Sequence, residues 1–506
     1  MEISKNIFRG YDIRGVYPTE IDEEVARTIG KGFATLMKQA GNEDVIVGRD
    51  VRLSSDALFE ALVEGVTSTG MNVVNIGRCM TPMTYFAREI LHIKPSIMIT
   101  ASHNPKEYNG FKICGMGRDT IFGEEIQDLR RFIEKGEFIQ TETKGIVKEN
   151  DIREIYLNYI TDRVKLGDKK LKVAVDCGSG AAGLFAREFF EKLGVEFYIE
   201  CEEPDGNFPI HHPDPSQEKN MLEFEKFIVE KECDIGIAFD GDADRIICFD
   251  ENGKILFGDE YMIVIWRDLI KAHPGAEAIL DVKCTQSLYE ELEKIGAKPR
   301  FVKVGSSYIK DEIRDNNLIF AGEYAGHIYF NDEYFGFDDS FYSAARTLKI
   351  LSSTDKKMSE LSDGINRYVG TPEKLVRVND ETKFETVEKC KNALLEKGYK
   401  VIDVDGARVI YDYGWGLVRA SNTGPNLTIK AEADTKENVE KIYVKGNNGI
   451  FFFRKTFFVD LSSAPAGYLW VTGSIFLKEM QRCFIRKHMK INRNSMIYPK
   501  NSTSSK

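Results

Sequence analysis

Short apolar runs alternate with amphipathic segments along most of the chain, and polar residues follow each apolar run. Residues 45–50 read as a buried strand, and the segment before it places apolar residues at helical spacing, namely Val25, Ile29, Phe33, Leu36 and Met37. Asp22 suits the N-cap of this helix and Gly41 suits its end. The pattern predicts repeated strand–loop–helix units, which are typical of α/β architecture.

The same unit returns further along the chain. We predict strands over 171–176, 234–240 and 278–283, and helices that end at Gly194 and cover 287–295. Ligands of open α/β sheets gather at the carboxyl ends of the strands, so the loops there are candidate sites. The region 366–445 differs and predicts an α+β domain, with strands over 375–378, 399–404 and 407–411 and helices over 384–397 and 433–443.

Length and composition favour a soluble protein of several domains. The chain has 506 residues, of which 42% are hydrophobic and 29% charged, and such a length is too great for a single core. The amino-terminal residues carry charge and no apolar run follows them, so we expect no signal peptide and a cytoplasmic location. The nine cysteines are scattered without a CxxC pair, which favours reduced thiols over disulfides or a zinc site.

Charge is unevenly distributed. The net charge of −11 makes a general nucleic-acid binder improbable, although local cations can still attract an anionic substrate. Residues 446–506 carry a net charge of +8, so the rest of the chain carries −19. Asp460 and Pro465 interrupt the apolar stretch of this tail, so we expect no membrane span. We interpret the tail as atypical, and a frame-shift artefact explains its abrupt composition better than a partner-binding extension.

Ser102 lies in the turn-forming segment 100–105, Thr-Ala-Ser-His-Asn-Pro. An isolated serine here is usually a helix cap or a turn residue. With His103 beside it and Lys112 ten residues on, it becomes a candidate nucleophile or carrier of a phosphoryl group. A hydrolase is the less favoured interpretation, because adjacent residues rarely face each other and no GxSxG motif is present.

Three carboxylates lie at alternate positions in the loop 240–245: Asp240, Asp242 and Asp244. Unpaired carboxylates at this spacing repel one another, so we favour a bound cation over a solvated acidic turn. The loop is too short for an EF-hand, and oxygen ligands suit Mg²⁺.

Basic and sugar-binding candidates complete the set. Single basic residues beside polar turns are usually surface charges, but five are candidates: Arg14, Arg49, Arg245, Lys283 and Arg419. The segment 419–424 is the stronger signal, because Arg419, Ser421, Asn422 and Thr423 combine a guanidinium with polar donors that could grip a phosphate. Glu323 and His327 could bind sugar hydroxyls, although a polar loop between two strands explains their spacing equally well.

Taken together, these motifs resemble the α-D-phosphohexomutases, most closely the bifunctional phosphomannomutase/phosphoglucomutase branch. The resemblance covers about residues 7–445, and its most specific segments are 8–15, 100–112, 175–180, 205–215, 240–245, 281–284, 336–339 and 414–423. It implies a heart-shaped molecule of three similar mixed α/β domains and a C-terminal α+β domain. We place them at 1–150 (phosphoserine loop), 151–252 (metal loop), 253–365 (sugar loop) and 366–445 (phosphate binding), before the tail 446–506.

The resemblance also implies roles for the candidate residues. Ser102 would be the phosphoserine and would share Mg²⁺ with Asp240, Asp242 and Asp244. His103, Lys112, Arg14 and Arg245 would serve catalysis. The substrate would be bound by Tyr11, Lys283, Glu323, His327, Arg419, Ser421, Asn422 and Thr423. The implied reaction interconverts hexose 1-phosphate and hexose 6-phosphate through a 1,6-bisphosphate, which also acts as activator.

Four positions depart from the family pattern. Ser306 replaces a frequent histidine, Ala325 a serine and Lys430 an arginine, and the first two leave the choice between mannose and glucose open. Ala243 replaces a frequent glycine, which we expect to be harmless.

Alternative functions remain at this point. A phosphoglucosamine mutase is one, and a metal-dependent sugar phosphatase of the haloacid-dehalogenase type is another, because 237–242 mimics its strand-end DxD motif. A phosphosugar sensor without activity would be expected to have lost Ser102 or a metal carboxylate. We expect a small phosphosugar substrate and a monomer or weak oligomer.

Overall fold

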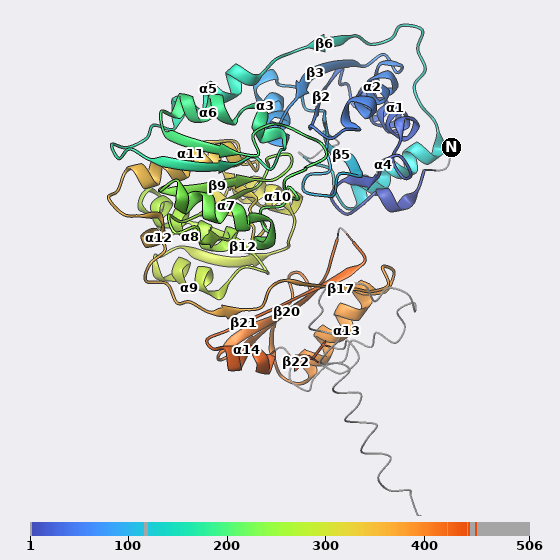
Figure 1. The fold of residues 1–506 in the computed structure, drawn as a ribbon. Helices are drawn as coiled ribbons and strands as arrows, with labels where there is room; N and C mark the ends of the chain where they lie inside the picture. Colours follow the sequence, from blue (N-terminus) through green and yellow to red (C-terminus); the bar gives the residue numbers. More distant parts are fainter. Residues whose placement is uncertain (1–2, 116–119, 423, 443, 446–450, 453–506) are drawn as a thin grey trace, which may run out of the picture.

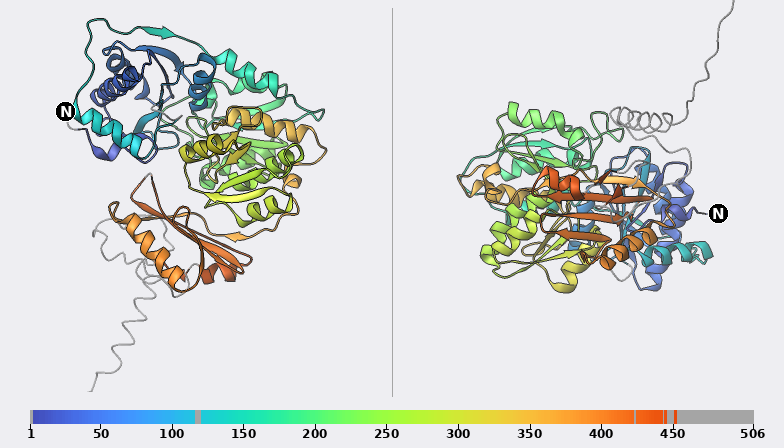
Figure 2. Two further views of the ribbon diagram at one scale, coloured as in Figure 1. Left: turned by 180° about the vertical axis from the view of Figure 1, so that it is seen from behind. Right: turned by 90° about the horizontal axis from the view of Figure 1, so that it is seen from below.

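The computed structural model describes residues 3–115, 120–422, 424–442, 444–445 and 451–452, and these form four domains around a cleft. In Figure 1 the first domain (blue) and the second and third domains (green to yellow) lie in an arc, and the fourth domain (orange) lies below them. Seen from below, the fourth domain lies across the other three (Figure 2, right). Among the described residues we find no helix with the length and apolar character that a membrane span requires.

The first domain is built on a six-stranded sheet of order β1-β5-β4-β2-β3-β6, in which β1 and β5 make the antiparallel edge. The strands are β1 (Ile13–Val16), β2 (Asp44–Arg49), β3 (Asn72–Arg78), β4 (Ser96–Ile99), β5 (Tyr108–Cys114) and β6 (Val147–Glu149). The helical segments are η1 (Lys5–Ile7), α1 (Glu23–Gln39), α2 (Ser55–Thr67), α3 (Thr81–Leu91) and α4 (Glu124–Lys135).

The second domain repeats this plan with a five-stranded sheet of order β11-β10-β9-β7-β8. The strands β7 (Lys172–Asp176), β8 (Glu196–Glu200) and β9 (Ile235–Phe239) are parallel to one another. The strand β10 (Ile246–Phe249) pairs antiparallel with β9, and β11 (Ile255–Leu256) pairs antiparallel with β10. The helical segments are α5 (Arg153–Arg163), η2 (Ala181–Leu184), α6 (Ala186–Leu193) and α7 (Glu218–Glu230).

The third domain has a four-stranded sheet of order β13-β12-β14-β15. Its strands are β12 (Glu277–Asp281), β13 (Lys298–Val302), β14 (Phe320–Gly322) and β15 (Ile328–Phe330). Its helices are α8 (Gly258–Ala272), α9 (Gln286–Lys294), α10 (Ser306–Asn316), α11 (Ser340–Ser352) and α12 (Met358–Leu361). The three domains share a mixed sheet with helices against it, as the alternating sequence pattern predicts.

The fourth domain is an antiparallel sheet of order β16-β21-β20-β19-β18, with β17 also paired to β21. The strands are β16 (Val369–Gly370), β17 (Lys374–Arg377), β18 (Lys400–Ile402), β19 (Ala407–Tyr411), β20 (Gly414–Ala420) and β21 (Asn426–Ala433), and the helices are α13 (Lys383–Glu396) and α14 (Lys436–Ile442). Beyond them, β22 (Val444–Lys445) pairs with β23 (Phe451–Phe452). The rest of the tail, on which the prediction of an artefact falls, lies outside the described residues.

Local sequence signals account for many of these elements. Asp22 caps α1 by accepting a hydrogen bond from the Val25 amide at 2.8 Å, and Gly41 follows the helix with a φ of 85°. The prediction in the fourth domain was wrong in two places. Ala433 ends β21, so the last helix begins at Lys436, and the two longest strands of the sheet, β20 and β21, were not predicted.

The first three domains are joined by a continuous buried core. One apolar cluster includes Ile46 of the first domain, Phe189 of the second and Phe341 of the third. The fourth domain has a core of its own, and a small cluster of Val282, Trp415 and Leu417 joins it to the third domain. The fourth domain can therefore move against the others at a much smaller cost in buried apolar surface.

Arg408 is the polar anchor of the fourth domain. Its guanidinium is fully buried, lies 3.6 Å from the Trp415 ring centre and donates hydrogen bonds to the carbonyls of Val282 and Cys284, both at 2.8 Å. Burial lowers the pKa of Arg408 to about 10, which leaves it charged at neutral pH. Its charge is held by backbone carbonyls of the third domain.

Replacing this anchor should loosen the fourth domain. We expect Arg408→Ala to weaken domain docking by about 3 kcal/mol or more, since it removes two charge-assisted hydrogen bonds and a stacked cation. Limited proteolysis of the segment 362–373, which precedes β17, would measure the loss as faster cleavage. The control is Lys389→Ala, because that side chain of α13 is 69% exposed. Equal cleavage rates in the two variants would show that Arg408 does not anchor the domain.

Candidate active site

The four domains meet at a cleft of about 1210 Å³, which collects most of the residues singled out from the sequence. It is lined by Tyr11, Arg14, Ser102, His103 and Lys112 of the first domain, Asp244 and Arg245 of the second, Lys283, Glu323 and His327 of the third, and Arg419, Ser421 and Asn422 of the fourth. Asp240 and Asp242 are fully buried beside it. Thr423 lies outside the described residues. Segments more than three hundred residues apart thus face one common space.

Ser102 lies in the loop between β4 and β5 with a strained backbone. Its φ is 48°, a left-handed conformation that costs a residue other than glycine about 1–2 kcal/mol. The hydroxyl donates a hydrogen bond to Asp240 Oδ2 at 2.7 Å and lies 3.1 Å from His103 Nδ1. Strain of this kind persists where neighbouring contacts impose it, and here it turns the hydroxyl toward the carboxylates.

Arg52 imposes this conformation, and sequence analysis missed it. Its guanidinium donates hydrogen bonds to four backbone carbonyls of the loop, those of Ser102, Asn104, Pro105 and Tyr108, at 2.6–3.0 Å. Its Nε lies 3.3 Å from the Asp50 carboxylate, and both side chains are buried. The candidate Arg49 instead contacts Asp56 and the ring of Phe59 and does not line the cleft. The sequence places both arginines in one polar run and offers no means to separate them.

Asp240, Asp242 and Asp244 follow the carboxyl end of β9 and converge. Each offers a carboxylate oxygen within 4.8 Å of the others, and all are buried. Burial, together with the charges of Asp244 and Asp242, raises the pKa of Asp240 well above its ordinary value. Burial also acts on Lys112, but Asp242 and Asp244 outweigh it and raise the pKa of the ammonium, whose Nζ is 2.8 Å from Asp242 Oδ2. Arg245 adds positive charge, with its Nε 3.8 Å from Asp240 Oδ2 and 4.0 Å from Asp244 Oδ1.

The carboxylate loop has the donor set of a divalent cation site. Among the described residues, no hydrogen-bond donor reaches the buried Oδ1 atoms of Asp242 and Asp244. Unpaired buried carboxylate oxygens are costly, and a hard cation with oxygen ligands satisfies them. Ala243 turns the loop with a φ of 55°. A glycine would adopt this conformation freely, so alanine here costs about 1–2 kcal/mol of backbone strain.

A hydrogen-bonded chain orients Arg245 at the edge of this loop. Arg245 Nε donates to His327 Nε2 at 2.9 Å, so His327 carries its proton on Nδ1, which faces Asp338 Oδ2 at 2.8 Å. Burial raises the pKa of Asp338, but Lys310 and His327 outweigh it and keep it ionised. His103 differs, because burial and the charges of Arg245 and Arg14 hold its pKa well below the usual range. The sequence did not indicate Asp338 as a site residue, because it lies in the segment 336–339, apart from the segments that carry Arg245 and His327.

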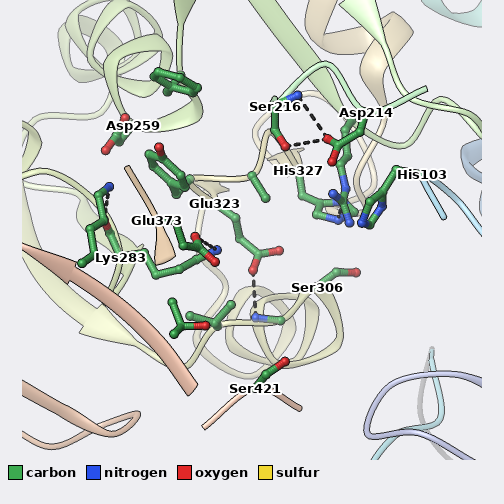
Figure 3. Close-up of a pocket in the computed structure, with 18 of the residues that line it drawn as sticks. His103, Asp214, Ser216, Asp259, Lys283, Ser306, Glu323, His327, Glu373 and Ser421 are labelled. Carbon is green, nitrogen blue, oxygen red and sulfur yellow. Dashed lines mark hydrogen bonds and ion pairs between the residues drawn. The ribbon is translucent and has the colours of Figure 1, made fainter. Parts of the chain in front are cut away.

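The far side of the cleft comes from the third and fourth domains and carries basic side chains that lie beside carboxylates. Figure 3 shows Glu323 projecting between His103 and His327 on one side and Ser421 and Lys283 on the other. Glu323 accepts hydrogen bonds from the Gly305 amide at 2.8 Å and the Tyr329 hydroxyl at 3.0 Å, which fix its carboxylate. Lys283 Nζ lies 3.4 Å from Glu373, and Arg419 Nε lies 3.0 Å from Asp405.

Three further features of this side bear on the sequence predictions. Lys430, noted only as a departure, places its Nζ 3.6 Å from the Tyr324 ring centre and donates to the Lys283 carbonyl at 2.8 Å. Ser306 lines the cleft and donates weakly to Asp338 at 3.4 Å. The Asn422 side chain donates to the Tyr11 hydroxyl, which links the fourth domain to the first. Glu373, Tyr324 and Asp405 were not predicted, because nothing in their local sequence marks them.

Comparison with known families agrees with this geometry. Four models of phosphoglucomutase/phosphomannomutase domains match the chain in order: α/β/α domain I at residues 5–140, domain II at 154–253, domain III at 257–368 and the C-terminal domain at 373–445.

Individual relatives match over nearly their whole length. The chain is 40% identical over 436 residues to a phosphomannomutase/phosphoglucomutase of Pseudomonas syringae, covering 86% of this chain and 93% of that protein. It is 38% identical over 442 residues to a phosphoglucomutase of Neisseria gonorrhoeae, covering 87% and 95%. A crystal structure of a phosphoglucomutase/phosphomannomutase family protein from Burkholderia thailandensis superposes with a TM-score of 0.81 at 35% identity, covering 87% of this chain and 96% of that one.

The role of Arg52 can be tested against Arg49. We expect Arg52→Met to destabilise the first domain by about 3–5 kcal/mol, because it leaves Asp50 as a buried, unpaired charge. Activity should fall further than the loss of stability alone explains, because the backbone carbonyls of the Ser102 loop lose the guanidinium that binds them. Arg49→Met is the matched control, and urea unfolding with activity assays under folding conditions measures both effects. Full activity in a folded Arg52→Met variant would contradict this role.

Proposed function

Because the chain belongs to the phosphoglucomutase/phosphomannomutase family, we propose that it is an isomerase that interconverts hexose 1-phosphates and hexose 6-phosphates of mannose and glucose. The observation that carries this proposal is the position of Ser102. Its hydroxyl lies at the cleft beside three converging carboxylates, and the same cleft is lined by Lys283, Arg419 and Ser421 of the third and fourth domains. A phosphoryl carrier opposite an anion-binding wall suits a substrate with a phosphate at either end.

In the proposed cycle Ser102 carries the phosphoryl group. Phosphoserine 102 transfers it to O6 of a hexose 1-phosphate, so that the P–Oγ bond breaks, a P–O6 bond forms and the O6 proton is released. The 1,6-bisphosphate turns within the cleft, its 1-phosphoryl group returns to Oγ, and hexose 6-phosphate leaves. Hexose 1,6-bisphosphate from solution would act as activator by phosphorylating Ser102 again whenever the group is lost.

Asp240, Asp242 and Asp244 suit Mg²⁺ together with an oxygen of the Ser102 phosphate. The ion would offset charge on the transferring phosphoryl group. Lys112, Arg14 and Arg245 line the same end of the cleft and add positive charge that is fixed before the reaction begins.

Proton transfer is divided between two neighbours of Ser102. Lys112 is held protonated by Asp242 and Asp244, so it suits stabilising the leaving Oγ rather than accepting a proton. His103 is kept neutral by its burial and by the nearby arginines, so it suits accepting the proton from the sugar hydroxyl.

The opposite wall would grip the phosphate that is not reacting. Arg419, Ser421 and Asn422 supply donors there, Thr423 extends the same segment, and Lys283 and Tyr11 lie beside them. Glu323 accepts sugar hydroxyls, and His327 acts through Arg245. This wall has to accept the phosphate in both substrate orientations, so it recognises a dianion and leaves sugar identity to Glu323 and its neighbours.

A phosphatase with Asp240 as nucleophile is less well supported. Asp240 is fully buried, accepts the Ser102 hydroxyl and does not line the cleft. A phosphoglucosamine mutase remains the second candidate, since Ser306 and Ala325 both line the cleft where sugar substituents would lie.

The setting of the enzyme follows from the same observations. The described residues of one chain line the whole cleft, which supports the proposal of a small phosphosugar substrate and a monomer or weak oligomer. The described cysteines are unpaired, which supports a reducing, cytoplasmic location.

Replacing Ser102 tests the carrier directly. With Mg²⁺ and a trace of glucose 1,6-bisphosphate, we expect Ser102→Ala to lose several orders of magnitude of mutase activity on mannose 1-phosphate and glucose 1-phosphate. Ser68→Ala, at the end of α2 and away from the cleft, should keep full activity. Preserved isomerisation in Ser102→Ala, or release of inorganic phosphate by the wild type, would contradict a mutase. Higher activity on glucosamine 1-phosphate would favour the second candidate.

Metal dependence provides a separate test. Chelation should abolish activity and Mg²⁺ should restore it. We expect Asp242→Asn to raise the Mg²⁺ concentration for half-maximal activity by about 10–100-fold or more, the range seen when even outer-sphere partners are lost. Asp268→Asn, on the exposed face of α8, is the control. An unchanged Mg²⁺ requirement in Asp242→Asn would place the metal elsewhere.

A further inference from the structure

A second group of metal-ligating side chains lies in the second domain, outside the cleft. Asp176 ends β7, Cys201 directly follows β8, and His211 comes from the loop beyond. The two strands are parallel with Asp176 opposite Glu200, so Asp176 and Cys201 both lie at the carboxyl edge of the sheet. None of the three lines the cleft described above.

The distances within this group match those of a metal centre. His211 Nε2 lies 3.0 Å from Asp176 Oδ2 and 3.5 Å from Cys201 Sγ, and all three ligand atoms lie within 4.8 Å of one another. In a tetrahedral zinc site, two nitrogen or oxygen ligands lie about 3.3 Å apart, and a nitrogen and a sulfur about 3.6 Å apart. The side chains are therefore already near ligating separation.

Neighbouring backbone groups orient two of the ligands as an outer shell does. His211 Nδ1 lies 3.0 Å from the carbonyl of His212, which can only accept, so Nδ1 carries a proton and Nε2 is directed at the group. Asp176 Oδ1 accepts from the Gly178 amide at 2.6 Å, and this leaves Oδ2 for the group. Cys201 is held at a φ of 49°, a strained conformation that aims its thiol at the same point.

We propose that Asp176, Cys201 and His211 form a binding site for a zinc-class divalent ion, with solvent completing a tetrahedral shell. The mixed nitrogen, sulfur and oxygen donors select zinc over Mg²⁺, whereas the all-oxygen group at Asp240 favours Mg²⁺. Cysteine spacing alone, which favours reduced thiols over a zinc site, could not indicate this group, because Cys201 and His211 lie ten residues apart and Asp176 comes from another strand. Cys201 and His211 are partly exposed, so the ion has a path from solvent.

Protons compete with a metal ion for the ligand atoms of His211 and Cys201. His211 Nε2 lies 3.0 Å from Asp176 Oδ2, so without a metal a proton on Nε2 joins the two side chains. Zinc must then displace the proton of Nε2 and that of the thiol, so binding releases protons and strengthens as pH rises.

The ion would fix one wall of the cleft. The loop that carries His211 continues to Asp214 and Ser216, which line the cleft. In the same loop Pro213 lies against Gly178 and Gly241, next to the carboxylate loop, so that a side chain at either glycine would contact the proline ring. Tying this loop to β7 and β8 would hold that wall in place without contact to the substrate, which is a structural role.

Zinc titration of the metal-free, full-length protein tests the site. With excess Mg²⁺ present, competition against a chromophoric chelator should show one zinc ion bound per chain, and the double variant D240N/D242N should keep it. Co²⁺ in its place should give a thiolate-to-metal charge-transfer band. We expect Cys201→Ser to remove the band, and both Cys201→Ser and His211→Asn to weaken zinc binding by more than about 100-fold.

The matched control is Cys233→Ser in the same domain, because Cys233 lies before β9 at the opposite edge of the sheet. It should bind zinc like the wild type. Zinc binding that survives in Cys201→Ser, or is lost in D240N/D242N, would overturn the proposal. If Cys201→Ser does not fold, alkylation of wild-type Cys201 by iodoacetamide decides instead: zinc should slow it, and an unchanged rate would also overturn the proposal.

Discussion

Burial of three carboxylates around one point is the constraint on which the active centre depends. Asp240, Asp242 and Asp244 are buried together and cannot all stay ionised without positive charge beside them. Lys112 supplies part of that charge, and hydroxyl groups of Thr81 and Thr100 donate to Asp242 at 2.6 and 3.1 Å. Two buried carboxylate oxygens still lack a donor among the described residues. These unpaired oxygens make the group a candidate cation site beside the Ser102 hydroxyl.

The domain arrangement serves this constraint. The first three domains share a continuous core, so the Ser102 loop, the carboxylate loop and Glu323 are held at fixed separations. The fourth domain has its own core and docks through Arg408 and a small apolar cluster. In the proposed cycle, this arrangement would let the substrate enter, turn and leave through movement of the fourth domain while the charged centre stays intact.

Sequence patterns predicted the elements that obey a single local rule. The sequence predicted the strands that end in polar loops and the Asp22 cap, because hydrophobic periodicity and neighbouring residues determine them. It also predicted the carboxylate group from the spacing of Asp240, Asp242 and Asp244. Arg52, Asp338 and the Asp176–Cys201–His211 group were not, since each acts through residues distant in the chain. Arg52 and Arg49 are three residues apart, and only tertiary contacts decide which one holds the Ser102 loop.

The central claim is that one phosphoryl group passes between Ser102 and the sugar. A pulse with ³²P-labelled glucose 1,6-bisphosphate, followed by a chase with unlabelled glucose 1-phosphate, tests it most directly. The account predicts an acid-stable label on Ser102 that moves into hexose phosphate during the chase. A hydroxylamine-sensitive label on Asp240, or label released as inorganic phosphate at the rate of turnover, would contradict it.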